Sequence, residues 1–222
     1  MTDFVRVNLI VEGQTEETFV RDTIAVHLAQ KQVYISHRLV KIGSGRGGLN
    51  NYATPRGDIK RWLSEDRQAF VTTMFDFYGL PKDFPGVSML RENMSPPEKV
   101  EIVERALAED INDERFVPYI QLHEFEALLF SDVDKLDLSI NSLTQQRSQI
   151  GALRRLISQF PNPEDINDGP TTAPSKRLLS LYSGYRKNIV GPLVAEEIGI
   201  AVLRARCPHF HNWLLSLERL NA

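Results

Sequence analysis

The pattern of apolar and polar positions divides the chain into a half with strands and helices and a half with helices only. Residues 5–11, 69–75 and 116–122 are apolar runs rich in β-branched and aromatic residues, and residues 33–42 alternate apolar and polar positions; both patterns are typical of strands. Residues 15–30, 55–66 and 95–110 lie between those runs and carry apolar side chains at helical spacing. This alternation predicts an α/β fold with a parallel four-stranded sheet flanked by helices.

The pattern changes after residue 132, where no further strand-like run occurs. Helical segments are predicted at residues 142–160, 174–182, 187–206 and 208–220. We therefore predict an α/β core over residues 1–132 and a helical appendage, packed on that core, over residues 133–222.

Three of the predicted strands end on an acidic residue. Glu12 follows the first strand, Asp76 the third and Glu124 the fourth. Parallel strands place their carboxyl ends at one edge of the sheet, where ligands of open α/β sheets bind, so we expect these side chains to converge. The alternative is that they are solvated turn residues, and that Glu16 is an ordinary acid in the first turn of a helix.

Converging carboxylates predict a site for Mg²⁺, or for Mn²⁺, because such ions prefer oxygen ligands. We expect Glu12, Glu16 and Asp76 to bind metal, and Glu124 or Glu126 to complete the site. On a regular helix starting near residue 123, Glu124 and Glu126 would point about 200° apart around the helix axis, so that only one of them could face the metal. Two bound ions can stabilise both the attacking and the leaving oxygen in phosphodiester cleavage, which makes this chemistry the expected one.

Candidate phosphate contacts lie in a glycine-rich stretch and in the helical half. Gly45 and Arg46 belong to a G-x-G-x-x-G pattern that no helix follows, which argues against a dinucleotide site but leaves a phosphate cradle or a plain surface loop. Lys176 or Lys187 could neutralise charge on a scissile phosphate, and Arg177 could contact nucleic acid. The alternative for all three is a solvated helix face.

Composition and charge restrict the class of protein further. A net charge of −3 argues against a protein that coats nucleic acid nonspecifically. The single cysteine, Cys207, excludes an internal disulfide, fits a reducing compartment and is expected to be buried rather than to bind zinc with the nearby histidines. No apolar run approaches the length of a membrane helix, so we expect a cytoplasmic protein without membrane association.

The strand-end motifs resemble those of the Toprim (topoisomerase-primase) superfamily. The sequence VNLIVEG at residues 7–13 is similar to its first motif, and FDFYG at residues 75–79 to its second, with Tyr78 where a second aspartate would stand. With EGQTEE, QLHEFEALLFSD, APSKR and CPHF, the chain resembles a small stand-alone Toprim-like family of uncharacterised bacterial proteins. This family is related to nucleases of the overcoming-lysogenization-defect type.

The resemblance implies a Toprim fold, metal binding by Glu12, Glu16 and Asp76, and an ABC-type or AAA ATPase partner encoded nearby. It also implies a role in defence against phage or in DNA processing. The first hypothesis is therefore a Mg²⁺-dependent endonuclease acting on nucleic acid, and a homo-oligomer is compatible with it. The second is a noncatalytic module that binds nucleic acid or the ATPase, which Tyr78 favours. A third, phosphotransfer to or hydrolysis of a small nucleotide, would use the same acids.

Overall fold

The computed structural model describes residues 4–40, 49–166 and 172–221. Its strands are β1 (Val5–Val11), β2 (Val33–Leu39), β3 (Phe70–Asp76), β4 (Phe116–Val117) and β5 (Ile120–Gln121). They form a parallel sheet in the order β2-β1-β3-β4, and β5 pairs with the carboxyl-terminal end of β3. The predicted α/β class with a parallel sheet is confirmed.

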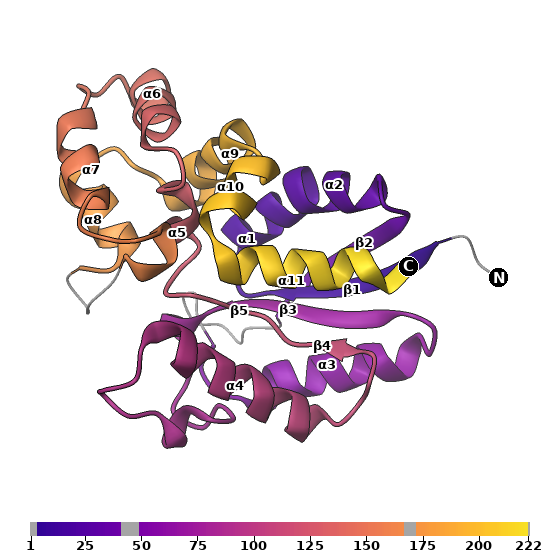
Figure 1. Cartoon of the computed structure of the whole chain (residues 1–222). Coiled ribbons are helices and arrows are strands. Elements are labelled where there is room, and N and C mark those ends of the chain that lie inside the picture. Colours follow the sequence, from indigo (N-terminus) through magenta and orange to yellow (C-terminus); the bar gives the residue numbers. More distant parts are fainter. Residues whose placement is uncertain (1–3, 41–48, 167–171, 222) are drawn as a thin grey trace.

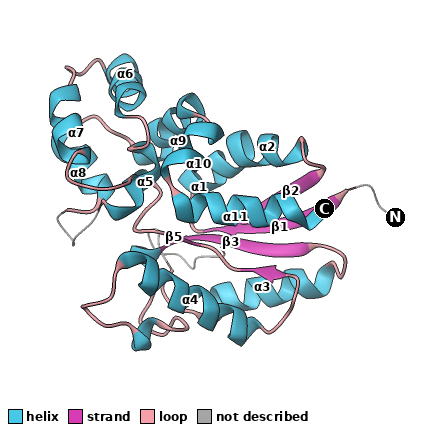
Figure 2. Cartoon of the chain, in the orientation of Figure 1, coloured by secondary structure: helices cyan, strands magenta, loops and turns pink. Residues whose placement is uncertain are grey.

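Helices cover both faces of this sheet (Figure 1). Along the chain they are α1 (Gln14–Phe19), α2 (Ala25–Ala29), α3 (Ala53–Glu65), α4 (Pro96–Ile111), α5 (Glu126–Leu129), α6 (Val133–Thr144), α7 (Ile150–Ile157), α8 (Pro174–Leu181), α9 (Lys187–Ile198), α10 (Ile200–Arg206) and α11 (Pro208–Glu218). A π-helical segment (Val20–Ile24) makes α1 and α2 one continuous rod, and short 3₁₀ turns occupy Phe77–Gly79, Val87–Met89, Pro163–Asp165 and Arg219–Asn221. Helices α3 and α4 lie on one side of the sheet, and α1, α2 and α11 on the other (Figure 2).

Each face of the sheet has its own apolar core because successive strand residues point to opposite faces. Leu9 packs with Phe19 and Phe210 on the side of α1 and α11. Its neighbour Ile10 packs with Trp62 and Val103 on the side of α3 and α4. Strand β1 is therefore buried on both faces, as its nearly continuous apolar sequence predicts.

Two predicted elements are divided in the structure. The strand expected over residues 116–122 is split into β4 and β5 at Pro118, which has no N–H to donate to the sheet. The helix expected over residues 187–206 ends at Gly199, whose φ of 84° is left-handed. The prediction of one helix over residues 142–160 is wrong. Helix α6 ends at Thr144, the next residue, Gln145, has a left-handed φ of 58°, and α7 begins at Ile150.

Of the C-terminal helices, some lie away from the sheet and the last one packs on it. Helices α6, α7 and α8 lie beyond its carboxyl-terminal edge, whereas α11 runs along the sheet itself (Figure 1). One buried cluster joins Val7 of β1 with Val194 of α9 and Leu217 of α11. The division at residue 132 stays a prediction. None of the helices in the described ranges has the length and apolar character that crossing a bilayer requires.

Candidate functional site

A pocket of about 420 Å³ opens at the carboxyl ends of β1 and β3. It is lined by acids, one lysine and small or aromatic residues: Glu12, Gly13, Thr15, Glu16, Asp76, Tyr78, Gly79, Glu124 and Lys187. The three acids predicted to follow strands therefore converge on one cavity, at the edge of the sheet where α/β proteins bind ligands.

The end of β1 is fixed against the end of β3. Glu12 follows β1 directly, and the backbone N–H of Asp76 donates a hydrogen bond to its Oε2 at 3.3 Å. The turn after β3 approaches Glu12 closely at Gly79: a Cβ there would lie 2.7 Å from Oε1 of Glu12 and would displace the end of this side chain. Gly79 thus leaves room for a carboxylate in the pocket.

A tight turn after β5 brings the third strand end to the same place. His123 adopts a left-handed φ of 64°, and its carbonyl accepts from the N–H of Tyr78 at 3.2 Å. The N–H of Phe125 then donates to Oδ1 of Asp76 at 2.9 Å. Helix α5 begins at Glu126 rather than near residue 123, so the two glutamates do not lie on one regular helix.

The two glutamates of this turn have different environments. Glu124 lines the pocket, and its Oε2 accepts from the backbone N–H of Ser175 at the start of α8, at 2.9 Å. Glu126 is fully buried behind the pocket, where Tyr185 donates from its hydroxyl to Oε1 at 3.4 Å. The turn therefore aims one carboxylate into the cavity and one toward the protein interior.

Lys187, the first residue of α9, places its ammonium group among these acids. Its Nζ lies 3.2 Å from Oε2 of Glu126, 3.3 Å from Oδ2 of Asp76 and 3.7 Å from Oε1 of Glu16. Its side chain is 40% exposed and so remains open to the pocket. One cation is thus shared by three buried carboxyl groups.

Burial and mutual repulsion change the protonation of the acids. Burial, followed by the charge of Glu16, raises the pKa of Glu12 from 4.5 to about 7. Burial also raises the pKa of Glu126 to about 7 and that of Asp76 well above its ordinary range, although the charge of Lys187 opposes both shifts. For Lys187, burial would lower the pKa, but the charges of Asp76, Glu126 and Glu16 outweigh it and raise the pKa.

The donor set fits a hard divalent cation. Within the described ranges, Oε1 of Glu16 and Oε2 of Glu126 are buried without a hydrogen-bond partner, and the Lys187 ammonium group lies 3.7 and 3.2 Å from them. No three His, Cys, Asp or Glu side chains of those ranges are grouped to enclose an ion by themselves. Mg²⁺ does not need such a cage, because it is usually held by one or two carboxylates together with water and substrate phosphate.

The structure brings most of the predicted site residues together. Glu12, Glu16, Asp76, Glu124 and Lys187 line the pocket, and Glu126 lies behind it. Their roles as metal or phosphate ligands stay predictions.

The remaining candidates lie elsewhere or outside the described part of the chain. Lys176 is not among the residues that line the pocket, although it follows Ser175 directly. Arg177 donates from Nε to the carbonyl of Thr172 at 2.6 Å and stacks over Phe160. Gly45 and Arg46 belong to residues 41–48, which the structure does not describe, so their predicted role is untested.

Sequence reasoning missed the contact between Tyr185 and Glu126. Tyr185 is 5% exposed, and 59 positions separate the two residues in the chain, so no local pattern connects them. The one available signal is that Tyr185 lies two positions before Lys187. The contact itself depends on how α9 packs against α5.

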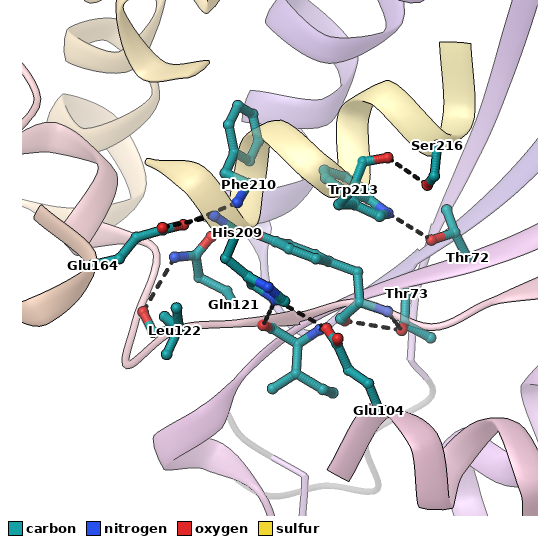
Figure 3. Close-up of polar contacts among 12 residues, drawn as sticks. Thr72, Thr73, Glu104, Gln121, Leu122, Glu164, His209, Phe210, Trp213 and Ser216 are labelled. Carbon is teal, nitrogen blue, oxygen red and sulfur yellow. Dashed lines mark hydrogen bonds and ion pairs between the residues drawn. The ribbon is translucent and has the colours of Figure 1, made fainter. Parts of the chain in front are cut away.

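A second buried polar cluster lies on the α11 side of β5 (Figure 3). The Glu164 carboxylate accepts from the backbone N–H groups of His209 and Phe210, at 2.8 and 2.9 Å, and so caps α11. The His209 ring contacts Oε1 of Glu104 at 3.0 Å, and Trp213 donates to the Thr72 hydroxyl at 2.9 Å.

Cys207 and His209 of the Cys-x-His-x-His sequence have partners within the protein. Cys207 is fully buried, as predicted, and its Sγ lies 3.3 Å from the hydroxyl of Ser131. The ring of Tyr119 stacks on both His209 and Trp213, with centroid distances of 5.1 and 4.1 Å.

Comparison with known proteins gives a family and a fold. A profile of the family described as Domain of unknown function (DUF4276) matches residues 11–218. The C-terminal region of the OLD protein from Xanthomonas campestris pv. campestris is similar in structure, with a TM-score of 0.50, 15% identity, and coverage of 97% of this chain and 95% of that one. The C-terminal region of the Burkholderia pseudomallei OLD protein has a TM-score of 0.50 and 17% identity, with coverage of 99% and 100%. No curated protein matches the chain.

At these identities the likeness shows a shared fold. It supports the predicted relationship to the overcoming-lysogenization-defect group at that level. Activity has to be argued from the site itself.

Proposed function

The chain belongs to the family described as Domain of unknown function (DUF4276) and, taking the acidic pocket as its functional site, we propose that it is a Mg²⁺-dependent nuclease that cleaves phosphodiester bonds. The observation that carries the proposal is the convergence of Glu12, Asp76 and Glu124 on one pocket that also holds Lys187. Clusters of buried acids with raised pKa values are characteristic of functional sites. The fold shared with the OLD C-terminal regions is consistent with this activity.

The pocket residues divide into those that would hold metal and those that would meet substrate. One or two of Glu12, Glu16 and Asp76 would bind each Mg²⁺ or Mn²⁺ ion together with water, and Glu124, fixed by the N–H of Ser175, would complete the shell. The bound ion would supply charge neutralisation at the phosphate and activation of water. Lys187 lines the pocket with a partly exposed ammonium group, so we assign to it, rather than to Lys176, the neutralisation of a phosphate oxygen.

The test is cleavage of supercoiled plasmid, linear DNA, single-stranded DNA and RNA by purified protein with Mg²⁺ or Mn²⁺. We expect cleavage by the wild type, and its loss in Glu12→Gln and Asp76→Asn, because each removes a charged metal ligand. Glu17→Gln is the matched control, since Glu17 adjoins Glu16 in α1 but does not line the pocket. A wild-type protein that binds metal and leaves every substrate intact, also with its ATPase partner present, would contradict the proposal.

We further propose that the chain acts with a separately encoded AAA or ABC-type ATPase in defence against phage. The support is that the similar solved structures are C-terminal regions of OLD proteins, and therefore parts of longer chains. Co-purification with the product of a neighbouring ATPase gene tests this setting independently of cleavage.

The second candidate is a noncatalytic module that binds nucleic acid or the ATPase. Tyr78 favours it, because this residue lines the pocket with 40% of its surface exposed, at the position of the second aspartate in the Toprim motif. Calorimetry separates the two candidates. Metal binding that disappears in Glu12→Ala and Asp76→Ala supports the nuclease, whereas absence of binding at millimolar metal supports the module.

A further inference from the structure

Glu126 is the one acid of the site that the pocket does not reach. It is fully buried, and the residues that line the cavity do not include it. Its Oε2 lies 3.2 Å from Nζ of Lys187 and accepts no hydrogen bond within the described ranges. Lys187, which does line the cavity, therefore contacts both the pocket and Glu126.

Tyr185 contacts the second carboxylate oxygen of Glu126. Its hydroxyl donates to Oε1 of Glu126 at 3.4 Å, and the tyrosine is 5% exposed. Gly191 of α9 makes room for this hydroxyl, since a Cβ there would lie 3.1 Å from it. Tyr185 and Lys187, two positions apart in one segment, thus hold the two oxygens of a single carboxylate.

The other two partners of Lys187 are proposed metal ligands. Asp76 and Glu16 both line the pocket, and their charge would be shared with a bound divalent ion. The ammonium group would then lose much of its attraction to them and would be repelled by the ion. Glu126 is the contact that remains available to it, because Glu126 does not line the cavity and is not one of the proposed ligands.

We propose that Glu126 is a positioning residue that holds the Lys187 ammonium group in the pocket when metal is bound, and that Tyr185 holds Glu126. This inference rests on the proposed function and gives Glu126 a role different from that of a metal ligand. It explains why the carboxylate is buried and kept between a tyrosine hydroxyl and a lysine.

The experiment compares Glu126→Gln with Glu12→Gln in Mn²⁺ titration calorimetry and in acylation of Lys187 followed by mass spectrometry. We expect Glu126→Gln to bind Mn²⁺ within about threefold of the wild type, and Glu12→Gln to bind at least tenfold more weakly. In saturating Mn²⁺ we expect Lys187 to be acylated at least fivefold faster in Glu126→Gln, because its anchor is gone. Tyr185→Phe removes one hydroxyl group and should also raise the acylation rate of Lys187, but by a smaller factor. This variant replaces Glu126→Gln in the test if Glu126→Gln does not fold.

Two results would overturn the inference. One is a loss of Mn²⁺ affinity in Glu126→Gln as large as that in Glu12→Gln, which would make Glu126 a ligand. The other is an unchanged acylation rate of Lys187 in both Glu126→Gln and Tyr185→Phe. Neither measurement uses cleavage, so a wild-type protein that binds Mn²⁺ but cuts no nucleic acid would contradict the proposed nuclease and leave this test intact.

Discussion

Two buried acidic clusters lie near β5, and they differ in how their carboxylates are satisfied. Glu164 accepts from two backbone N–H groups of α11, and Glu104 accepts from the N–H of Ile120 at 2.7 Å while contacting His209. In the pocket, by contrast, Glu16 and Glu126 each have a buried oxygen that accepts no hydrogen bond within the described ranges, and one lysine is shared by three acids.

The difference distinguishes a structural acid from a functional one. Burial raises the pKa of Glu164, but the two backbone donors of α11 oppose this rise, and no neighbouring acid is the main cause of it, so this carboxylate forms part of the fold. Buried carboxylates that repel one another gain from a cation, and this is the property of a ligand site. Removing a charge should therefore destabilise the first cluster and stabilise the second.

The largest effect is expected for Glu164→Ala. The substitution leaves the buried N–H of Phe210 and the N–H of His209 without an acceptor and removes the cap of α11. We expect the free energy of unfolding to fall by about 3 kcal/mol, because each unsatisfied buried donor costs about 1 to 3 kcal/mol. Urea denaturation followed by circular dichroism measures the change.

The matched control is Glu98→Ala. Glu98 completes the capping box of α4 at the protein surface by accepting from the N–H of Ser95 at 2.7 Å. An exposed cap is worth about 1 kcal/mol, since water replaces the lost acceptor. Equal losses in the two variants would show that burial of Glu164 contributes nothing.

In metal-free protein, Glu12→Gln is expected to raise the free energy of unfolding rather than to lower it. The pKa of Glu12 is about 7 in the folded chain against an ordinary 4.5, so the folded state binds more protons than the unfolded state between these values. Stability should be greatest below pH 4.5 with respect to this group and should fall as pH rises to about 7. Glutamine cannot ionise, so we expect Glu12→Gln to be more stable by about 3 kcal/mol at pH 8, since the pKa rises from 4.5 to about 7 and one pKa unit corresponds to about 1.4 kcal/mol.

The measurement is thermal or urea unfolding from pH 4.5 to pH 8 in the presence of a chelator. Millimolar Mg²⁺ should recover the lost stability of the wild type at pH 8 and should leave Glu12→Gln unchanged. If Glu12→Gln is instead less stable than the wild type at pH 8, Glu12 is a structural acid like Glu164.

The sequence predicts the convergence of the acids but not their contacts. Apolar runs identify the strands, and the common edge of parallel strands then brings Glu12 and Asp76 together without knowledge of any side chain. Local signals also place the start of α4, where Ser95 and Glu98 form a capping box. These features depend on residues that are close in the chain or on general rules of sheet topology.

The contacts that differ from expectation depend on tertiary packing. The left-handed φ of His123 lets Glu124 and Glu126 take separate environments. A histidine in the sequence does not by itself predict a left-handed φ. Lys187 reaches Asp76 from 111 positions away, and Lys176, which has the same chemistry, does not line the pocket. Only the packing of α9 against α1 and α5 decides between the two lysines.

A smaller effect is expected for Gly79→Ala, which tests how closely the pocket is shaped. The added Cβ would lie 2.7 and 2.9 Å from the two carboxylate oxygens of Glu12, and it would move the end of that flexible side chain. We expect Mn²⁺ affinity to fall about tenfold, or about 1.4 kcal/mol, with little change in stability. Gly57→Ala is the control, because a Cβ there meets nothing within 4 Å, and it should leave metal binding unchanged.

The smallest effect is expected for Thr72→Val in the structural cluster. Thr72 is fully buried and accepts from the Trp213 indole N–H at 2.9 Å, so valine leaves one neutral donor unsatisfied. We expect a loss of about 1 kcal/mol, the lower end of the cost of such a group, because the stack of Trp213 on Tyr119 remains.

Thr72→Ser keeps the hydroxyl group and serves as the control in urea unfolding, while calorimetry of both variants should show unchanged Mn²⁺ affinity. Thr72 lies on β3 four residues before Asp76, so any loss of Mn²⁺ affinity in Thr72→Val would mean that the two clusters are coupled through this strand. The distinction between a structural and a functional cluster would then fail at β3, the strand that both of them share.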